Sequence, residues 1–300
     1  MQRFLIALLF SLVPLFAFAQ NQDQGQGQDQ NQNQGQAQDQ QQGDSPLVRD
    51  LRKLNWQDGP TKAMIGDKAF VQVPKGYTFL GEQDTGRFLE LMGNPRIDHH
   101  YMVAPEDLKW FAVFSFEDTG YVKDDDKIDA DALMQKLKEQ DGPENERRRS
   151  LGIRALYTDG WEVPPHYDAQ TKRLEWGTRL RDDRGNVNAN YTSRLLGRSG
   201  VMSAVLVSGI DTLPANTKEF ESMLTNFSYN PGETYAEFKS GDKIAEYGLA
   251  ALILGGAAAV ATKKGFWAVL GGLLVASWKL IAGVAAAGAA GIGRMFKKKQ

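Results

Sequence analysis

Residues 172–208 read KRLEWGTRLRDDRGNVNANYTSRLLGRSGVMSAVLVS and contain three segments rich in apolar, aromatic and β-branched residues. The segments are 172–181, 187–196 and 201–208, and turn-forming residues fill the gaps between them, at 182–186 and 198–200. Segments of this length joined by tight turns pair as antiparallel neighbours. The stretch therefore predicts a three-stranded antiparallel meander, and this meander decides the fold class.

The rest of the predicted domain, residues 47–240, adds strands and helices to the meander. A hairpin of 61–65 and 68–73 opens it, and 110–116 is apolar on both faces, which indicates a central strand covered on both sides. Helices are expected at 82–92, from residue 128, at 143–151, and after an N-cap at Asn216. Strands in hairpins with helices on their faces predict an α+β fold, an antiparallel sheet with flanking helices.

Prolines suggest two local interruptions. Gly142-Pro143 is expected to end the helix that begins near residue 128, because proline lacks the N–H that a helix interior needs. Pro164-Pro165 is expected to make 161–167 a rigid loop between the helices and the meander.

The C-terminal segment, residues 244–296, is predicted to be a transmembrane helical anchor. Residues 247–300 contain seven Lys or Arg and no acidic residue within an Ala-, Gly- and Leu-rich run. Lysines divide the run into three apolar blocks, each only about 21–24 Å long as helix against a hydrocarbon core of ~30 Å, so the number of crossings stays open. One net crossing places the basic C-terminal tail in the cytoplasm, as the positive-inside rule favours, and a helical hairpin is the second possibility.

The N-terminus predicts export. Residues 1–19 combine a short basic start with an apolar run that ends in Ala17-Phe18-Ala19, the pattern of a cleavable signal peptide. Residues 20–46 are rich in Gln, Asn, Asp and Gly and are expected to be a disordered linker, because such a composition cannot bury apolar surface. The expected location is the bacterial inner membrane, with the globular domain in the periplasm.

Charge limits the expected partners. The net charge is −2 and residues 247–300 contribute +7, so residues 1–246 carry −9, which argues against nucleic acid. With no cysteine, the chain forms no disulfide and does no thiolate chemistry. Membrane lipid is the expected partner of the anchor. Small residues spaced by four could also support self-association or a membrane-protein partner, unless they are merely common in weakly hydrophobic anchors: Ala251, Gly255 and Ala259, and Gly283, Ala287 and Gly291.

Four residues are candidates for catalysis. Glu117 and Asp118 follow the central strand, where adjacent carboxylates can act as acid and base but more often cap a turn. His166 and Asp168 follow two stiffening prolines. The pair His99-His100 is expected to be a solvated surface pair, because adjacent side chains on an extended segment point to opposite faces. Ser199 lacks the Gly-x-Ser-x-Gly pattern of a nucleophile elbow.

A metal site is a weak hypothesis. Asp124, Asp126 and Asp129 could belong to a calcium loop, but its alternating ligands, central Gly and closing Glu are missing. Acidic residues at a helix start, where they oppose the helix dipole, are the favoured explanation. No cofactor is expected, because the chain has no phosphate-binding Gly-rich loop.

Several motifs resemble a bacterial family of uncharacterised membrane-anchored proteins with a domain of unknown function. The likeness covers nearly all of residues 50–296 and rests on 116–125, 160–168, Asn190-Tyr191, 196–198, Tyr235, Phe238 and 247–251. It implies a periplasm-facing domain on a C-terminal anchor and carries no activity with it. The order of elements alone is also similar to small sandwich domains of the Mog1/PsbP type.

The sequence leaves three functions open. A binding or interaction module of the cell envelope is the favoured interpretation, because no catalytic constellation is visible, and an enzyme is the less favoured class. The first alternative is an envelope hydrolase that uses Glu117, Asp118, His166 and Asp168. The second is a structural subunit of a membrane assembly.

Overall fold

The computed structural model describes residues 46–92, 96–150 and 154–255. The predicted signal peptide, almost all of the predicted linker and the predicted anchor beyond Gly255 lie outside these residues. Among the described helices, none has the length and apolar character that crossing a bilayer requires.

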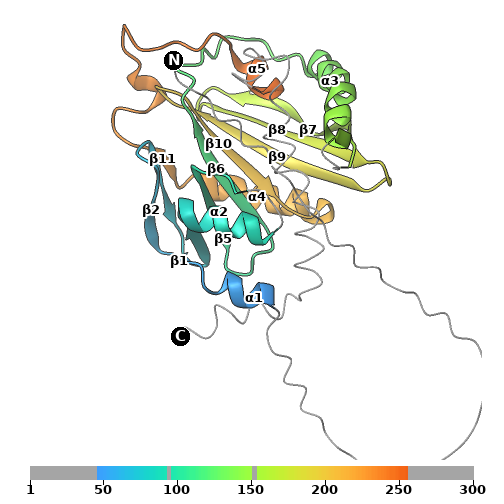
Figure 1. Cartoon of the computed structure of the whole chain (residues 1–300). Coiled ribbons are helices and arrows are strands. Elements are labelled where there is room, and N and C mark those ends of the chain that lie inside the picture. The colour runs from blue at the N-terminus through green and yellow to red at the C-terminus, as the bar shows by residue number, and fades with distance from the viewer. Residues whose placement is uncertain (1–45, 93–95, 151–153, 256–300) are drawn as a thin grey trace, which may run out of the picture.

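Two antiparallel sheets form the frame of the domain (Figure 1). The eight-stranded sheet has, in spatial order, β1 (Gln57–Asp58), β4 (Tyr77–Leu80), β5 (His100–Pro105), β6 (Phe111–Glu117), β10 (Val201–Val207), β9 (Val187–Leu196), β8 (Arg173–Asp182) and β7 (Leu156–Asp168). The smaller sheet has the order β11 (Phe227–Tyr229), β3 (Ala69–Val73) and β2 (Thr61–Ile65).

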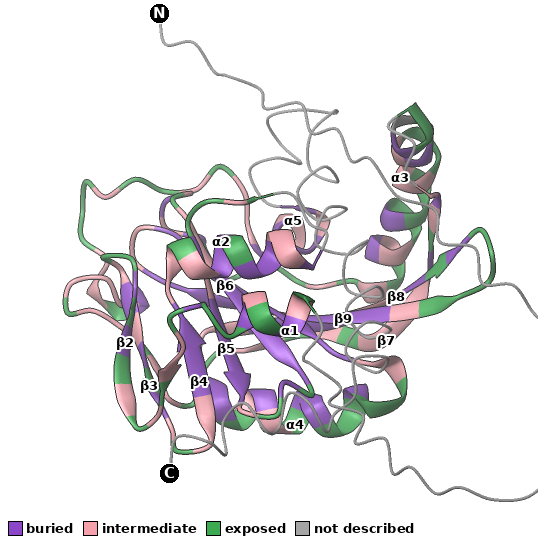
Figure 2. Cartoon of the chain, turned by 60° about the horizontal axis from the view of Figure 1, so that its bottom comes forward, coloured by how far each residue is buried: buried purple, intermediate pink, exposed green. Residues whose placement is uncertain are grey.

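Helices cover both faces of the large sheet (Figure 2). The helices on one face are α1 (Pro46–Leu51), α2 (Glu82–Leu91), α3 (Ala130–Ser150) and α5 (Leu249–Leu254). The other face packs against α4 (Leu213–Leu224) and the small sheet, and two short 3-10 turns, η1 (Ile210–Thr212) and η2 (Tyr235–Glu237), complete the chain. Buried residues accordingly form three clusters: one under α1 and α2, one under α3 and α5, and one between the sheet, α4 and the small sheet.

The predicted α+β class is confirmed. β8, β9 and β10 form the antiparallel meander, and β6 lies between β5 and β10, with its first four residues buried. The opening hairpin is β2 and β3. The apolar pattern located these strands because each alternates against, or lies wholly within, a packed layer.

The prediction of a rigid loop at 161–167 is wrong, because this stretch lies in β7. β7 is an edge strand that pairs only with β8, and its register shifts around Trp161–Val163 and between Val163 and His166. Proline is tolerated in a strand at an edge or a bulge, where no partner needs its N–H. Pro164 and Pro165 thus mark an irregular edge rather than a loop.

The predicted break at Pro143 is also wrong, because α3 continues through it. The helix is held by side chains that bond the free edge of β7. Asn145 donates to Leu156 O at 2.7 Å and accepts from Leu156 N at 2.8 Å, and Asp141 accepts from Thr158 N at 2.7 Å. These bonds also satisfy the edge of the sheet, which would otherwise be open to another strand.

Asn216 is not the predicted N-cap, because α4 already begins at Leu213. Its side chain is buried inside the first turns and donates to Ser208 Oγ at 2.6 Å and to Thr212 Oγ1 at 3.1 Å. Asn216 therefore ties α4 to the end of β10 instead of starting the helix.

The helix α5 packs on the domain. Leu249, Leu252 and Ile253 are buried against residues of the α3 side of the sheet, among them Leu133 and Trp176. Gly255 ends the helix with φ at 118°, a left-handed conformation that suits glycine. The first residues of the segment predicted as anchor are therefore part of the folded core.

Candidate functional site

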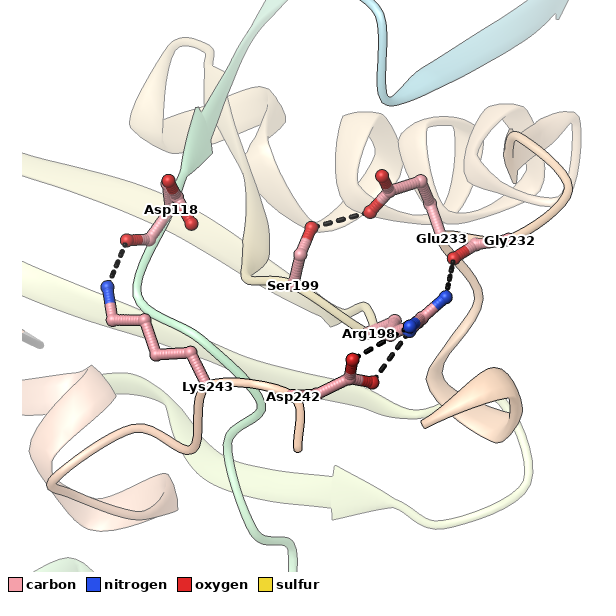
Figure 3. A pocket seen from close by; sticks show the side chains of 7 residues that line it. All are labelled: Asp118, Arg198, Ser199, Gly232, Glu233, Asp242 and Lys243. Carbon is pink, nitrogen blue, oxygen red and sulfur yellow. Dashed lines mark hydrogen bonds and ion pairs between the residues drawn. The ribbon is translucent and has the colours of Figure 1, made fainter. Parts of the chain in front are cut away.

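A pocket lies where four loops meet at one end of the large sheet (Figure 3). The loops are those after β6, between β9 and β10, after β11, and before α5. The pocket has a volume of about 260 Å³ and is lined by Asp118, Arg198, Ser199, Gly232, Glu233, Asp242 and Lys243. Charged side chains thus dominate its walls.

The turn between β9 and β10 places Arg198 and Ser199 in the pocket. Gly197 N donates to Gly200 O at 2.8 Å, and the turn lies tightly against its neighbours. A Cβ at Gly200 would lie 2.1 Å from Glu117 O, and one at Gly197 would lie 2.7 Å from the Tyr229 ring. The two glycines are needed for this close approach.

Arg198 and Asp242 form a two-pronged ion pair across the pocket. Nε donates to Asp242 Oδ2 and the second guanidinium nitrogen donates to Oδ1, both at 2.7 Å, and a third bond reaches Gly232 O at 3.1 Å. Paired bonds of this geometry are strong and directional. The hydrogen bond from Arg198, with one from the backbone of Lys239, lowers the pKa of Asp242 to about 2.

Glu233 accepts two side-chain hydrogen bonds. Lys68 donates to Oε1 at 2.7 Å and Ser199 donates to Oε2. Partial burial pushes the pKa of Glu233 upward, but the bonds from Lys68 and Ser199 outweigh this effect, so the pKa is lowered. Glu233 is therefore ionised at neutral pH.

Lys243 and Asp118 form the opposite wall. Lys243 Nζ donates to the carbonyl oxygen of Asp118 at 3.1 Å, and the backbones of Tyr121 and Lys243 pair at 2.8 Å. Gly120, with φ at 89°, brings the two segments together, since a Cβ there would lie 2.7 Å from Lys243 O. Among the described residues, the Asp118 carboxylate receives no hydrogen bond.

An aromatic stack supports the loops beneath the pocket. The Tyr121 ring lies 4.4 Å from that of Tyr235 and 4.3 Å from that of Phe238, measured between centroids. Tyr235 also donates its hydroxyl to Val122 O at 2.9 Å. The aromatic residues of the quoted motifs thus hold the segment that carries Glu233 and Asp242.

The ion pair predicts an acid-sensitive contribution to stability. The pKa of Asp242 falls from a usual value of 3.8 to about 2 on folding, so its carboxylate stabilises the fold above about pH 4 and loses this effect as the pH falls towards 2. Asp242→Asn should lower the melting temperature of the full chain at pH 6, and the difference from the wild type should shrink at pH 2.5. Melting followed by circular dichroism at both pH values checks this, and an unchanged difference would contradict it.

The predicted pair Glu117 and Asp118 divides between two environments. Asp118 lines the pocket, whereas Glu117 Oε1 accepts a bond from Arg194 on the face of the sheet that α3 and α5 cover. Arg194 is 4% exposed and was not identified from the sequence. Its position in the middle strand of the predicted meander was the available signal, because a cation in a covered strand needs a partner.

His166 lies on the other face of the sheet from Glu117. Its cross-strand partner on β8 is Glu175, and the partner of Glu175 on β9 is Ser193. The cross-strand partner of Glu117 on β10 is Val201, and the partner of Val201 on β9 is Leu196. Cross-strand partners lie on the same face of a sheet, so Ser193 marks the face of His166 and Leu196 marks the face of Glu117. Residues three apart on one strand point to opposite faces. The structure therefore does not bring Glu117 and His166 together.

His166 instead meets a carboxylate that the sequence analysis missed. Its Nε2 lies 3.6 Å from Glu175 Oε2, and the Glu175 side chain is 4% exposed. Asp168 closes the β7–β8 turn, where it accepts bonds from Gln170 N and Thr171 Oγ1. Each candidate on this strand thus has a local structural partner.

The two adjacent histidines differ. His99 is exposed and lies 3.0 Å from Glu82, whereas His100 is buried with Nδ1 2.7 Å from Asp98 O. Burial lowers the pKa of His100. The expectation of a solvated pair holds only for His99.

The weak metal candidates have separate partners. Asp124 accepts from Tyr167 and Lys172, both at 2.7 Å, and Asp129 caps α3 by accepting from Ala132 N at 3.0 Å. Asp126 lies against Gly248, where an added Cβ would be 2.1 Å from its Oδ2. Within the described part of the chain, no group of three or more His, Cys, Asp or Glu side chains could hold a metal ion.

Arg198 and Asp242 were not predicted to form a site, although the sequence around each of them favours an exposed loop. Arg198-Ser199 is enclosed by glycines in the turn 197–200, and Asp242 follows Ser240-Gly241. Charged residues in glycine-rich loops are exposed and are placed where binding residues commonly lie. Nothing in the sequence, however, indicated that these two loops meet.

Comparisons with known proteins place the chain in a family and show a weak structural likeness. Residues 57–288 match the model of a family described as "Protein of unknown function (DUF2167)". The search of curated proteins gave no match. The solution structure of cyanobacterial PsbP (CyanoP) from Synechocystis sp. PCC 6803 is similar with a TM-score of 0.33 and 12% identity, over 58% of this chain and 92% of that chain.

Proposed function

This chain belongs to the DUF2167 family, and we propose that it is a membrane-anchored envelope protein whose domain is a periplasm-facing binding module. The signal-peptide pattern of residues 1–19 and the basic, apolar run after Gly255 support this location. The family match continues to residue 288 and so includes most of the apolar run.

The single observation that carries the binding role is the pocket described above. Its charged groups are fixed in advance by Arg198–Asp242 and by Lys68–Glu233–Ser199. A site held in position by such pairs loses little side-chain freedom when a ligand binds. The pocket is built from loops on a rigid sheet, which is the usual arrangement of binding sites.

The hydrolase alternative is less well supported. Glu117 and His166 lie on opposite faces of the sheet, and Glu117 is engaged by Arg194. A general base and its partner need to be within hydrogen-bond reach of one reacting group. We therefore favour binding over hydrolysis.

Photo-crosslinking in intact cells tests the binding role. Ser240 is exposed and next to the pocket without lining it, so Ser240→p-benzoylphenylalanine should leave the ion pairs intact. We expect irradiation to yield a specific adduct with a protein, peptide or lipid, identified by mass spectrometry. The matched control is Val187→p-benzoylphenylalanine, at an exposed position at the far end of the sheet. Equal adducts from both positions, or none from Ser240, would contradict the proposal.

A further inference from the structure

The pocket retains unused hydrogen-bonding capacity of both signs. Three of the five N–H groups of Arg198 are engaged, so two remain, and Lys243 uses one of its three. The Asp118 carboxylate lines the same cavity and accepts no hydrogen bond from the described residues. The pocket therefore offers N–H donors from Arg198 and Lys243 and a carboxylate acceptor from Asp118.

The pocket wall carries charges of both signs. Three carboxylates, Asp118, Glu233 and Asp242, and two cations, Arg198 and Lys243, line it, and Lys68 bonds Glu233 from outside the lining. A simple anion would approach three carboxylates, and a simple cation would approach two basic groups. A ligand that carries both charges can pair with groups of both signs.

We propose that the pocket binds a zwitterion with an ammonium and a phosphate group, as in phosphoethanolamine. The ammonium lies against the Asp118 carboxylate, and the phosphate accepts from Arg198 and Lys243, which stand on opposite sides of the cavity in Figure 3. Charge-assisted bonds of both kinds are stronger than neutral ones. This inference rests on the proposed function and names the ligand of the same pocket.

The size of the cavity agrees with this ligand. Its volume of about 260 Å³ lies just below the ~300–1,000 Å³ of drug-sized ligand pockets. A headgroup-sized molecule fits such a space, whereas a folded partner does not. The volume and the charges of the pocket therefore both favour a small zwitterionic ligand.

The position of the pocket suggests a lipid headgroup as one source of this chemistry. Five non-helical residues and then α5 separate Lys243 from Gly255. This segment spans at most about 30 Å. If the chain enters the bilayer after Gly255, the headgroup layer lies within reach of the pocket. A free phosphoethanolamine-type solute is the other source.

Calorimetric titration of the full chain in non-ionic detergent tests the ligand class. The probes are O-phosphoethanolamine, ethanolamine and inorganic phosphate. Because the zwitterion gains contacts at both ends, we expect it to bind at least about tenfold more tightly than either half. Equal affinity for the zwitterion and for phosphate would overturn the inference.

Two variants identify the contacts. Asp118→Asn should reduce the affinity for O-phosphoethanolamine to that for phosphate, and Lys243→Gln should weaken both ligands about equally. Asp183→Asn is the matched control, because it makes the same change at an exposed turn at the other end of β9. If Asp118→Asn binds the zwitterion as the wild type does, the inference fails.

Nanodiscs distinguish the two sources. Weaker apparent binding of O-phosphoethanolamine in phosphatidylethanolamine discs than in phosphatidylglycerol discs would show that the lipid headgroup competes. Equal binding in both discs would indicate a soluble ligand, and both outcomes support the zwitterion. If the zwitterion does not bind while Ser240 still forms a specific adduct, only the ligand class is wrong. If both experiments fail, the proposed function is wrong.

Discussion

Leu252→Ala is expected to destabilise the domain by about 3 kcal/mol, within the ~2–5 kcal/mol range of buried Leu-to-Ala changes. Leu252 is fully buried in α5, where it packs with Leu133 and Trp176. The change removes apolar burial and leaves a cavity between α5 and the sheet. The effect follows only if α5 belongs to the domain rather than to a lipid-embedded anchor.

Thermal melting of the full chain in non-ionic detergent measures this effect. For a domain of this size about 2–4 °C are lost per kcal/mol, so the melting temperature should fall by about 6–12 °C. Leu254→Ala is the matched control, because Leu254 is only partly buried and should cost less. Unchanged melting of Leu252→Ala would mean that α5 does not stabilise the domain.

Glu117→Ala is expected to destabilise the domain by about 2–3 kcal/mol, somewhat less than the ~3–5 kcal/mol for breaking a fully buried pair, because Glu117 is partly exposed. The loss leaves the Arg194 guanidinium buried without its carboxylate. Arg194 Nε is already without a partner among the described residues, so the variant would leave a further buried guanidinium nitrogen without its carboxylate.

A double variant separates the buried charge from the loss of packing. In Glu117→Gln with Arg194→Met neither charge remains, and at least half of the lost stability should return, because apolar replacements of buried ion pairs are often neutral. Denaturant unfolding of the three proteins gives the comparison. If the double variant is as unstable as Glu117→Ala, the unpaired arginine is not the cause.

The strands of the middle of the sheet could be predicted because their burial pattern is local. Residues 110–116 and 201–208 are apolar on both faces, and in the structure both strands are covered on both sides. The turns of the meander contain Gly, Asn and Asp, whose backbone preferences are visible in sequence. Local preference and tertiary packing agree in this region.

The edge of the sheet could not be predicted because its partners are distant. The two prolines of β7 predict a loop from the sequence. In the structure, Asn145 and Asp141 of α3 bond the backbone of β7, and these contacts cannot be inferred from the local sequence. The helix α3 that makes these bonds continues through Pro143. Tertiary contacts overrode the local signals at both places.

The candidate site was predictable only in part. Asp118 was identified from its place after the central strand, but its neighbours Arg198 and Asp242 come from loops 44 positions apart in the chain. Adjacent carboxylates in sequence suggested a pair at Glu117 and Asp118. Alternation along the strand end separated them, so that one meets Arg194 and the other lines the pocket.

The most direct test of the account is the side of the membrane on which the domain lies. The chain has no cysteine, so Asp183→Cys introduces a single thiol at an exposed turn away from the pocket. Intact cells are treated with a maleimide that does not cross the inner membrane, and Lys299→Cys reports the predicted cytoplasmic tail. The account predicts labelling of Asp183→Cys before lysis and of Lys299→Cys only after lysis. Protection of Asp183→Cys in intact cells, with labelling after lysis, would contradict it.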